Sequence, residues 1–60
     1  MDTKDIRRKI LDEYKNSYIF GDPEQHGDWL YYWLLKGNNK QVIRWNAKTD
    51  EHETIMKLYY

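Results

Sequence analysis

The stretch from Trp29 to Leu35 constrains the fold of this chain more than any other part of the sequence. It reads WLYYWLL, an unbroken run of apolar and aromatic residues that holds two of the three tryptophans and is soon followed by Gly37-Asn38-Asn39. A short run of this composition that ends at a turn sequence is typical of a β-strand. Successive side chains of a strand point to opposite sides, so we expect both faces of this strand to be apolar.

A short helix over residues 29–36 is the competing interpretation. Asp28 could cap its start and Gly37 its end, and Trp29, Tyr32 and Trp33 would then share one face. Such a helix would be apolar on every side, however, and aromatic residues are more typical of a pleated surface. We therefore predict a strand at about 29–36.

An amphipathic helix is predicted over residues 3–19. Asp2 is suited to its N-cap, and Gly21, followed by Asp22-Pro23, to its end. Arg7 lies within the apolar stripe, where its stem can cover ring surface or its head can bind an anionic partner. The stripe repeats at the helical period and consists of Ile6, Ile10, Leu11, Tyr14 and Tyr18.

Residues 20–28 are predicted to form a polar loop between the helix and the first strand. The loop contains two of the three glycines and the only proline. Its acidic residues and histidine raise the question of a metal site, but a metal site needs three or four convergent ligands and these residues are spread along a loop. We expect them to form turns and caps, with no metal and no cofactor. They are Asp22, Glu24, His26 and Asp28.

Two further strands, at about 41–46 and 52–59, complete the predicted fold. The chain is therefore predicted to be a single small α+β domain over residues 1–60. One N-terminal helix would pack on a three-stranded antiparallel β-meander, in the order α-β-β-β. At 60 residues the chain is near the lower limit at which a hydrophobic core suffices without crosslinks.

The first turn of the meander is predicted at Asn38-Asn39, because asparagine tolerates the positive φ of a two-residue hairpin turn. This turn would pair Leu35 with Val42 and Trp33 with Arg44. A loop of three residues would instead shift the register by one residue and mix the two faces.

The second turn is predicted to be a type I turn followed by a left-handed residue at Asp50. It would place Arg44 opposite Glu53 and Val42 opposite Ile55. One opposite-charge pair and one aliphatic pair then arise together, which supports this register.

These registers divide the strand residues between two faces. We expect the helix to cover the face without formal charge, because burying a charge is costly. That face would carry Leu30, Tyr32, Leu34, Ile43, Trp45, Met56 and Leu58. The other face would carry Trp29, Tyr31, Trp33, Leu35, Val42, Ile55 and Tyr59, together with Arg44, Glu53 and Lys57.

An aromatic face that no helix covers is the usual mark of an interaction site. The alternative is a self-covered sheet, in which lysine and arginine stems and the 20–28 loop shield the rings and Arg44 lies over Trp33. On the interaction hypothesis the binding residues are Trp29, Tyr31, Trp33, Arg44, Lys57 and Tyr59.

Composition excludes several classes of protein. The 10 basic and 10 acidic residues cancel to a net charge of zero, which counts against binding of duplex nucleic acid. The absence of cysteine excludes disulfides and thiolate metal sites, and it fits the cytoplasm. The N-terminus is charged throughout and no apolar run reaches the roughly 18–20 residues of a membrane span, so we expect no membrane association.

An enzyme is not expected. His26 and His52 are far apart in sequence, and Ser17, the only serine, has no evident base. The glycines are scattered among turns, so nothing resembles a phosphate-binding loop.

Three binding hypotheses remain. The first is a protein–protein interaction module, either an adaptor or inhibitor-like domain or a homodimer, since Tyr, Trp and Arg are enriched at interface hot spots. The second is single-stranded nucleic acid or RNA, with bases stacked on the rings. Its phosphates would meet Lys36, Lys40, Arg44 and Lys57. The third is a carbohydrate stacked on the aromatic face.

Overall fold

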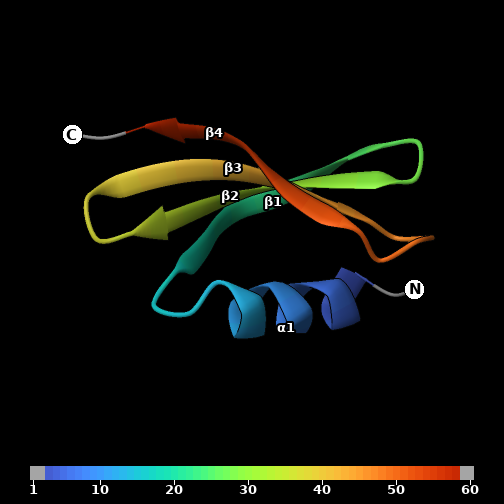
Figure 1. Cartoon of the computed structure of the whole chain (residues 1–60), viewed down its shortest axis with the longest axis horizontal. Helices are drawn as coiled ribbons and strands as arrows, with labels where there is room; N and C mark the ends of the chain where they lie inside the picture. The colour runs from blue at the N-terminus through green and yellow to red at the C-terminus, as the bar shows by residue number, and fades with distance from the viewer. Residues whose placement is uncertain (1–2, 59–60) are drawn as a thin grey trace.

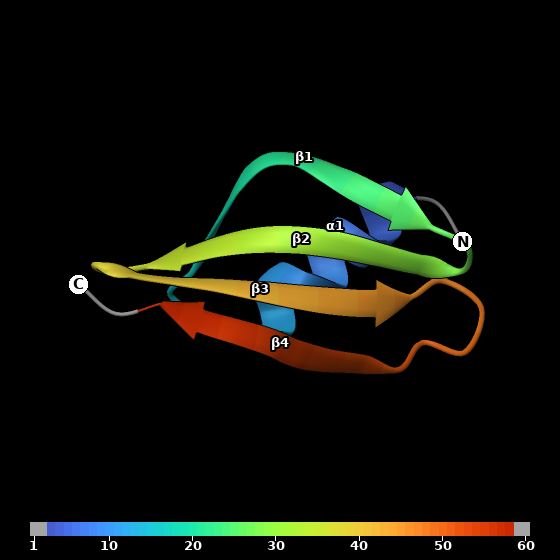
Figure 2. The same ribbon diagram turned by 90° about the horizontal axis from the view of Figure 1, so that it is seen from above.

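The computed structural model describes residues 3–58 and contains one helix and one antiparallel sheet of four strands. The α+β class is confirmed, but the sheet has four strands rather than the predicted three. The strands are hydrogen-bonded in chain order, and the helix lies against one face of the sheet, below it in Figure 1 and behind it in Figure 2. The elements are α1 (Thr3–Glu13), β1 (Tyr18–His26), β2 (Trp29–Lys36), β3 (Asn39–Asn46) and β4 (His52–Leu58).

The additional strand, β1, occupies the segment predicted as the end of the helix and the polar loop. The helix ends at Glu13 rather than at residue 19, and Asn16 then adopts a left-handed conformation with φ of 66°. Asparagine tolerates this conformation and can end a helix much as glycine does. Gly21 is therefore not the helix terminator. It lies instead where the pairing of β1 with β2 is irregular, between Phe20 and Glu24.

Two-residue turns join β1 to β2 and β2 to β3. Gly27 and Gly37 are the first residues of these turns, with φ of 64° and 62°. Glycine at this position is typical of the type II′ turn, which matches the twist of paired strands. The second turn thus consists of Gly37-Asn38, not of Asn38-Asn39, and Lys36 pairs with Asn39.

This turn moves the register of β2 and β3 by two residues from the prediction. Trp33 lies opposite Val42, and Tyr31 lies opposite Arg44. The predicted pairs of Leu35 with Val42 and Trp33 with Arg44 are wrong. Because side chains alternate with a period of two, a shift of two leaves each of these residues on its predicted face.

The hairpin of β3 and β4 follows the prediction near its turn and departs from it farther along. Asp50 is left-handed with φ of 67°, and Arg44 pairs with Glu53. An irregularity between Val42 and Ile43 then pairs Val42 with Met56 rather than with Ile55.

The irregularity exchanges the faces of two predicted residues. Met56, expected beneath the helix, lies across from Val42 on the other face, and 51% of it is exposed. Lys57, expected on the aromatic face, lies across from Gln41 on the helix side. Leu58 pairs through its backbone with Lys40, and Tyr59 lies outside the described residues. A bulge of this kind adds a residue to one strand and so inverts the alternation beyond it.

The hydrophobic core lies between α1 and the sheet. Two isoleucines one helical turn apart supply the helix side, and alternate residues of β2 and β3 supply the sheet side. This is the face expected to lie beneath the helix. The buried residues are Ile6, Ile10, Leu30, Tyr32, Leu34, Ile43 and Trp45. Within residues 3–58 no helix has the length and apolar character needed to traverse a bilayer.

The β2–β3 turn predicts different costs for substitutions at its two positions. A Cβ on Gly37 would meet no atom within 4 Å, so Gly37→Ala introduces only the backbone strain of positive φ. We expect a loss of about 1–2 kcal/mol in the free energy of unfolding by urea denaturation. Asn38→Ala should change it by less than about 0.5 kcal/mol. Equal losses of unfolding free energy in both variants would contradict the assignment of Gly37 to the position with positive φ.

Candidate functional site

The face of the sheet turned away from α1, which we call the open face, is the candidate binding surface. In Figure 2 it faces the viewer, and none of the elements of residues 3–58 lies over it. One cross-strand row runs through all four strands and is entirely apolar, formed by Phe20, Trp33, Val42 and Met56. The next row adds Tyr18 opposite Leu35. We call these six residues the apolar patch.

The residues of the apolar patch remain in contact with solvent. Tyr18 is 72% exposed and Phe20 is 38% exposed, whereas Trp33 and Leu35 are half-buried. The corresponding residues on the other side of β2, such as Tyr32 and Leu34, are at most 1% exposed. The chain therefore buries one apolar face of this strand and leaves the other partly open.

Arg44 borders the apolar patch and is held by three neighbours. Its guanidinium carbon lies 4.0 Å from the centre of the Trp29 ring, and a guanidinium nitrogen pairs with Glu53. The pKa of Arg44 is raised, chiefly by its hydrogen bond with Tyr31. The predicted cation–π contact of Arg44 therefore exists, but with Trp29 rather than with Trp33. It covers part of the Trp29 ring and leaves Trp33 clear of the guanidinium.

The other end of this border is formed by β1. The His26 ring lies edge-on to the Tyr31 ring, with 5.1 Å between centroids, and it is 3.8 Å from a Glu24 carboxylate oxygen. On the opposite side of the patch, the Lys40 ammonium is 6.0 Å from the centre of the Phe20 ring. Charged and polar groups thus flank the apolar patch on two sides.

The structure divides the predicted binding residues. Trp33 lies in the apolar patch, whereas Trp29, Tyr31 and Arg44 form its polar border. Lys57 lies on the helix side of the sheet.

Sequence reasoning missed Tyr18 and Phe20, which lie in the patch because β1 is a strand. A signal for this strand was present: Gly27-Asp28 between His26 and Trp29 is a typical type II′ hairpin sequence. That hairpin requires a strand on its N-terminal side.

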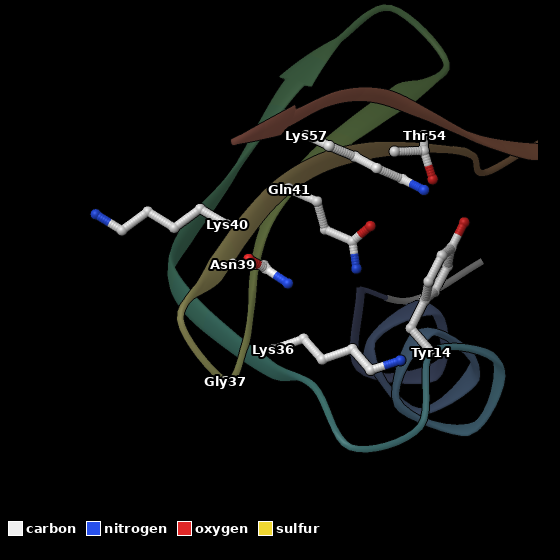
Figure 3. Close-up of a pocket in the computed structure, with 8 residues that line it drawn as sticks. All are labelled: Tyr14, Lys36, Gly37, Asn39, Lys40, Gln41, Thr54 and Lys57. Atoms are coloured by element: carbon white, nitrogen blue, oxygen red, sulfur yellow. The ribbon is translucent and has the colours of Figure 1, made fainter. Parts of the chain in front are cut away.

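On the helix side, a hollow of about 530 Å³ lies where the sheet extends past the end of α1 (Figure 3). Its walls come from β2, β3, β4, the β2–β3 turn and Tyr14 just after the helix. Its lining residues are mostly polar in type and include three lysines and no carboxylate, and their aliphatic and aromatic parts also face the hollow. The lining residues are Tyr14, Lys36, Gly37, Asn39, Lys40, Gln41, Thr54 and Lys57.

A polar cluster fastens the β3–β4 turn to the helix. The Trp45 indole nitrogen donates a hydrogen bond of 2.7 Å to Asp50, and the Lys9 ammonium donates to both oxygens of that carboxylate at 3.0 and 3.1 Å. The His52 ring stacks on Trp45 with 4.3 Å between centroids, and its Nδ1 lies 3.1 Å from the Tyr14 hydroxyl. The hydrogen bond from Trp45, and then that from Lys9, lowers the pKa of Asp50.

Arg7 lies beside a smaller hollow of about 200 Å³ that is also lined by Pro23 and Tyr32. The Tyr32 side chain is 1% exposed, and its hydroxyl has no hydrogen-bond partner among the described residues. Burial raises the pKa of Tyr32, and the positive charge of Arg7 opposes this effect.

The acidic residues and histidine considered as metal ligands lie along β1 and its turn rather than at one point. Within residues 3–58, no group of three His, Asp or Glu side chains is placed to hold a metal ion. Comparison of the chain with models of known protein families, with curated proteins and with solved structures finds no match.

The Asp50 cluster predicts a pH dependence of stability. Because the folded state lowers the pKa of Asp50, this carboxylate stabilises the fold above its ordinary pKa of 3.8, and the contribution is lost as the pH falls through the folded-state pKa. We expect the urea midpoint of the natural chain to fall more between neutral pH and about pH 3 than that of Asp50→Asn. Asparagine keeps an acceptor for Trp45 and tolerates positive φ. Identical pH profiles for the two proteins would contradict this role.

Proposed function

We propose that this chain is a small non-catalytic protein–protein interaction module that binds another polypeptide through the open face of its sheet. The observation that carries the proposal is the apolar row of Phe20, Trp33, Val42 and Met56, which crosses all four strands and is covered by no element of residues 3–58. Contiguous exposed apolar surface of this kind marks interaction sites in small soluble domains.

The surroundings of the apolar patch support a protein partner. Protein interfaces combine an apolar, aromatic centre with a polar rim that stays in contact with water. Here the rim consists of Arg44 with Glu53 and His26 with Glu24 on one side, and of Lys40 on the other. Trp33, in the central strand β2, is the residue we expect to act as the hot spot.

Binding of single-stranded nucleic acid to the same rings is less well supported. The four basic residues suggested for phosphate contacts are divided between the two faces, since Lys36 and Lys57 lie on the helix side. On the open face, Arg44 is already paired with Glu53. A carbohydrate could stack on the exposed rings, but only Trp33 and Phe20 offer adjacent rings within the apolar row.

The partner is either a second copy of the chain or a different protein, for which this domain would serve as an adaptor or inhibitor. In both cases the same patch is buried. We propose a cytoplasmic location, because the chain has no cysteine and disulfide-free domains are typical of that reducing compartment.

The test replaces two rings of the patch, in the double variant Phe20→Ser and Trp33→Ser. Loss of hot-spot rings should weaken binding by about 2 kcal/mol or more. Sedimentation equilibrium measures self-association of the natural chain. If it is monomeric, the chain is used to capture a protein from the source cell, and binding of the purified protein is measured by calorimetry. Circular dichroism verifies that each variant is folded.

The matched control is Leu11→Ser, because Leu11 is 41% exposed on the helix and lies outside the sheet. Its binding should equal that of the natural chain. Unchanged association in the double variant, or an open face that binds only an oligonucleotide or a polysaccharide, would overturn the proposal.

A further inference from the structure

The hollow on the helix side of the sheet differs in chemistry from the open face. It lies next to the core, in the row that continues from Leu34 through Gln41 to Lys57. Leu34 is buried beneath α1, whereas Lys57 is exposed because the helix does not reach that part of β4. The polar side chains that continue the core face therefore surround an open space.

Two lysines approach this space from opposite sides. Figure 3 shows the Lys36 side chain entering from β2 and the Lys57 side chain from β4, with the amide of Gln41 between them. Lys40 extends away from the hollow in the same view. Within residues 3–58, no carboxylate forms an ion pair with Lys36 or Lys57. The charges of Lys36 and Lys57 are thus not neutralised by a carboxylate in the part of the chain that the structure describes.

We propose that this hollow binds the phosphate group of a small phosphorylated ligand. Lysine ammonium groups bind phosphate as point charges, and charge-assisted hydrogen bonds of this type are stronger than neutral ones. Lys36 and Lys57 hold the phosphate, and the Asn39 and Gln41 amides donate further hydrogen bonds to it or to adjacent hydroxyls. A volume of about 530 Å³ is in the range of small-molecule sites and accommodates more than inorganic phosphate alone.

Tyr14 and Thr54 complete the site on the side of the helix. The Tyr14 hydroxyl lies 3.1 Å from His52 Nδ1, which fixes the ring at the edge of the hollow. A sugar or base attached to the phosphate can pack against this ring. The ligand class is therefore a phosphate ester of the size of a nucleoside monophosphate, either free or as part of a nucleic acid strand.

The test is a titration of the full chain with adenosine 5′-monophosphate, followed through the backbone amide signals by NMR. Adenosine, inorganic phosphate and a single-stranded oligonucleotide form the other arms. The double variant Lys36→Gln and Lys57→Gln removes both charges and keeps hydrogen-bonding side chains. The matched control is Lys48→Gln, because Lys48 is an exposed lysine in the β3–β4 turn and does not line the hollow.

We expect the nucleotide to shift the signals of Lys36, Gln41 and Lys57, and inorganic phosphate to compete with it. Loss of the two lysines should weaken binding about tenfold or more, and Lys48→Gln should leave it unchanged. Tighter binding of the oligonucleotide at the same signals would identify a nucleic acid as the source of the phosphate.

Three results would overturn the proposal. The first is equal binding of adenosine and its monophosphate, and the second is binding that the double variant retains. The third is a lower unfolding midpoint in the double variant with no binding by the natural chain, which would show that the lysines serve only to stabilise the end of α1.

Discussion

One helix on a four-stranded sheet is the constraint on which the rest of this structure depends. The helix has 11 residues and buries Ile6 and Ile10 against the sheet, so its apolar stripe can cover only one face. Buried and partly exposed residues consequently alternate along β2, with Tyr32 beneath the helix and Trp33 on the open face. Within residues 3–58 there is no second element to cover that face, although both sides of β2 are apolar. The surface that we propose for partner binding results from this mismatch between two apolar faces of the sheet and a single helix that covers one of them.

The limited area that the helix covers also accounts for the polar regions of the sheet. Where the helix stops short of β4, the core face ends in Lys57, Gln41 and Thr54 rather than in apolar residues. On the open face, Arg44 is held over Trp29 by its contacts with Tyr31 and Glu53. The apolar surface that no charged side chain covers therefore lies around Trp33. Apart from Lys40, which lies beside Phe20 and also lines the hollow, the residues proposed for the protein partner and for the phosphorylated ligand differ, so each proposal is tested separately.

The sequence predicted the fold class, the strand nature of 29–36 and the face on which the core lies, because alternation in β2 and β3 is strong and a register error of two residues does not change it. It did not predict β1. Tyr14 and Tyr18 continue the helical period of Ile6 and Ile10, and this pattern concealed the end of the helix at Glu13, three residues before the left-handed Asn16. The bulge in β4 was also missed, since no glycine marks it, and this error exchanged Met56 and Lys57 between the faces. Trp33 therefore lies on the face predicted for it, whereas Tyr18 and Phe20 of β1 and Met56 of β4 were not expected on that face.

The most direct test of this account is the solvent accessibility of the tryptophan side chains in a sample that sediments as a monomer. A soluble paramagnetic probe enhances the NMR relaxation of protons that it can approach. We expect strong enhancement for the Trp33 ring protons and little for those of Trp45, which is 4% exposed beneath the helix. Burial of Trp33 by a bound partner should then abolish its enhancement. Protection of Trp33 equal to that of Trp45 in the monomer would contradict the account, because the chain would already cover the surface on which binding depends.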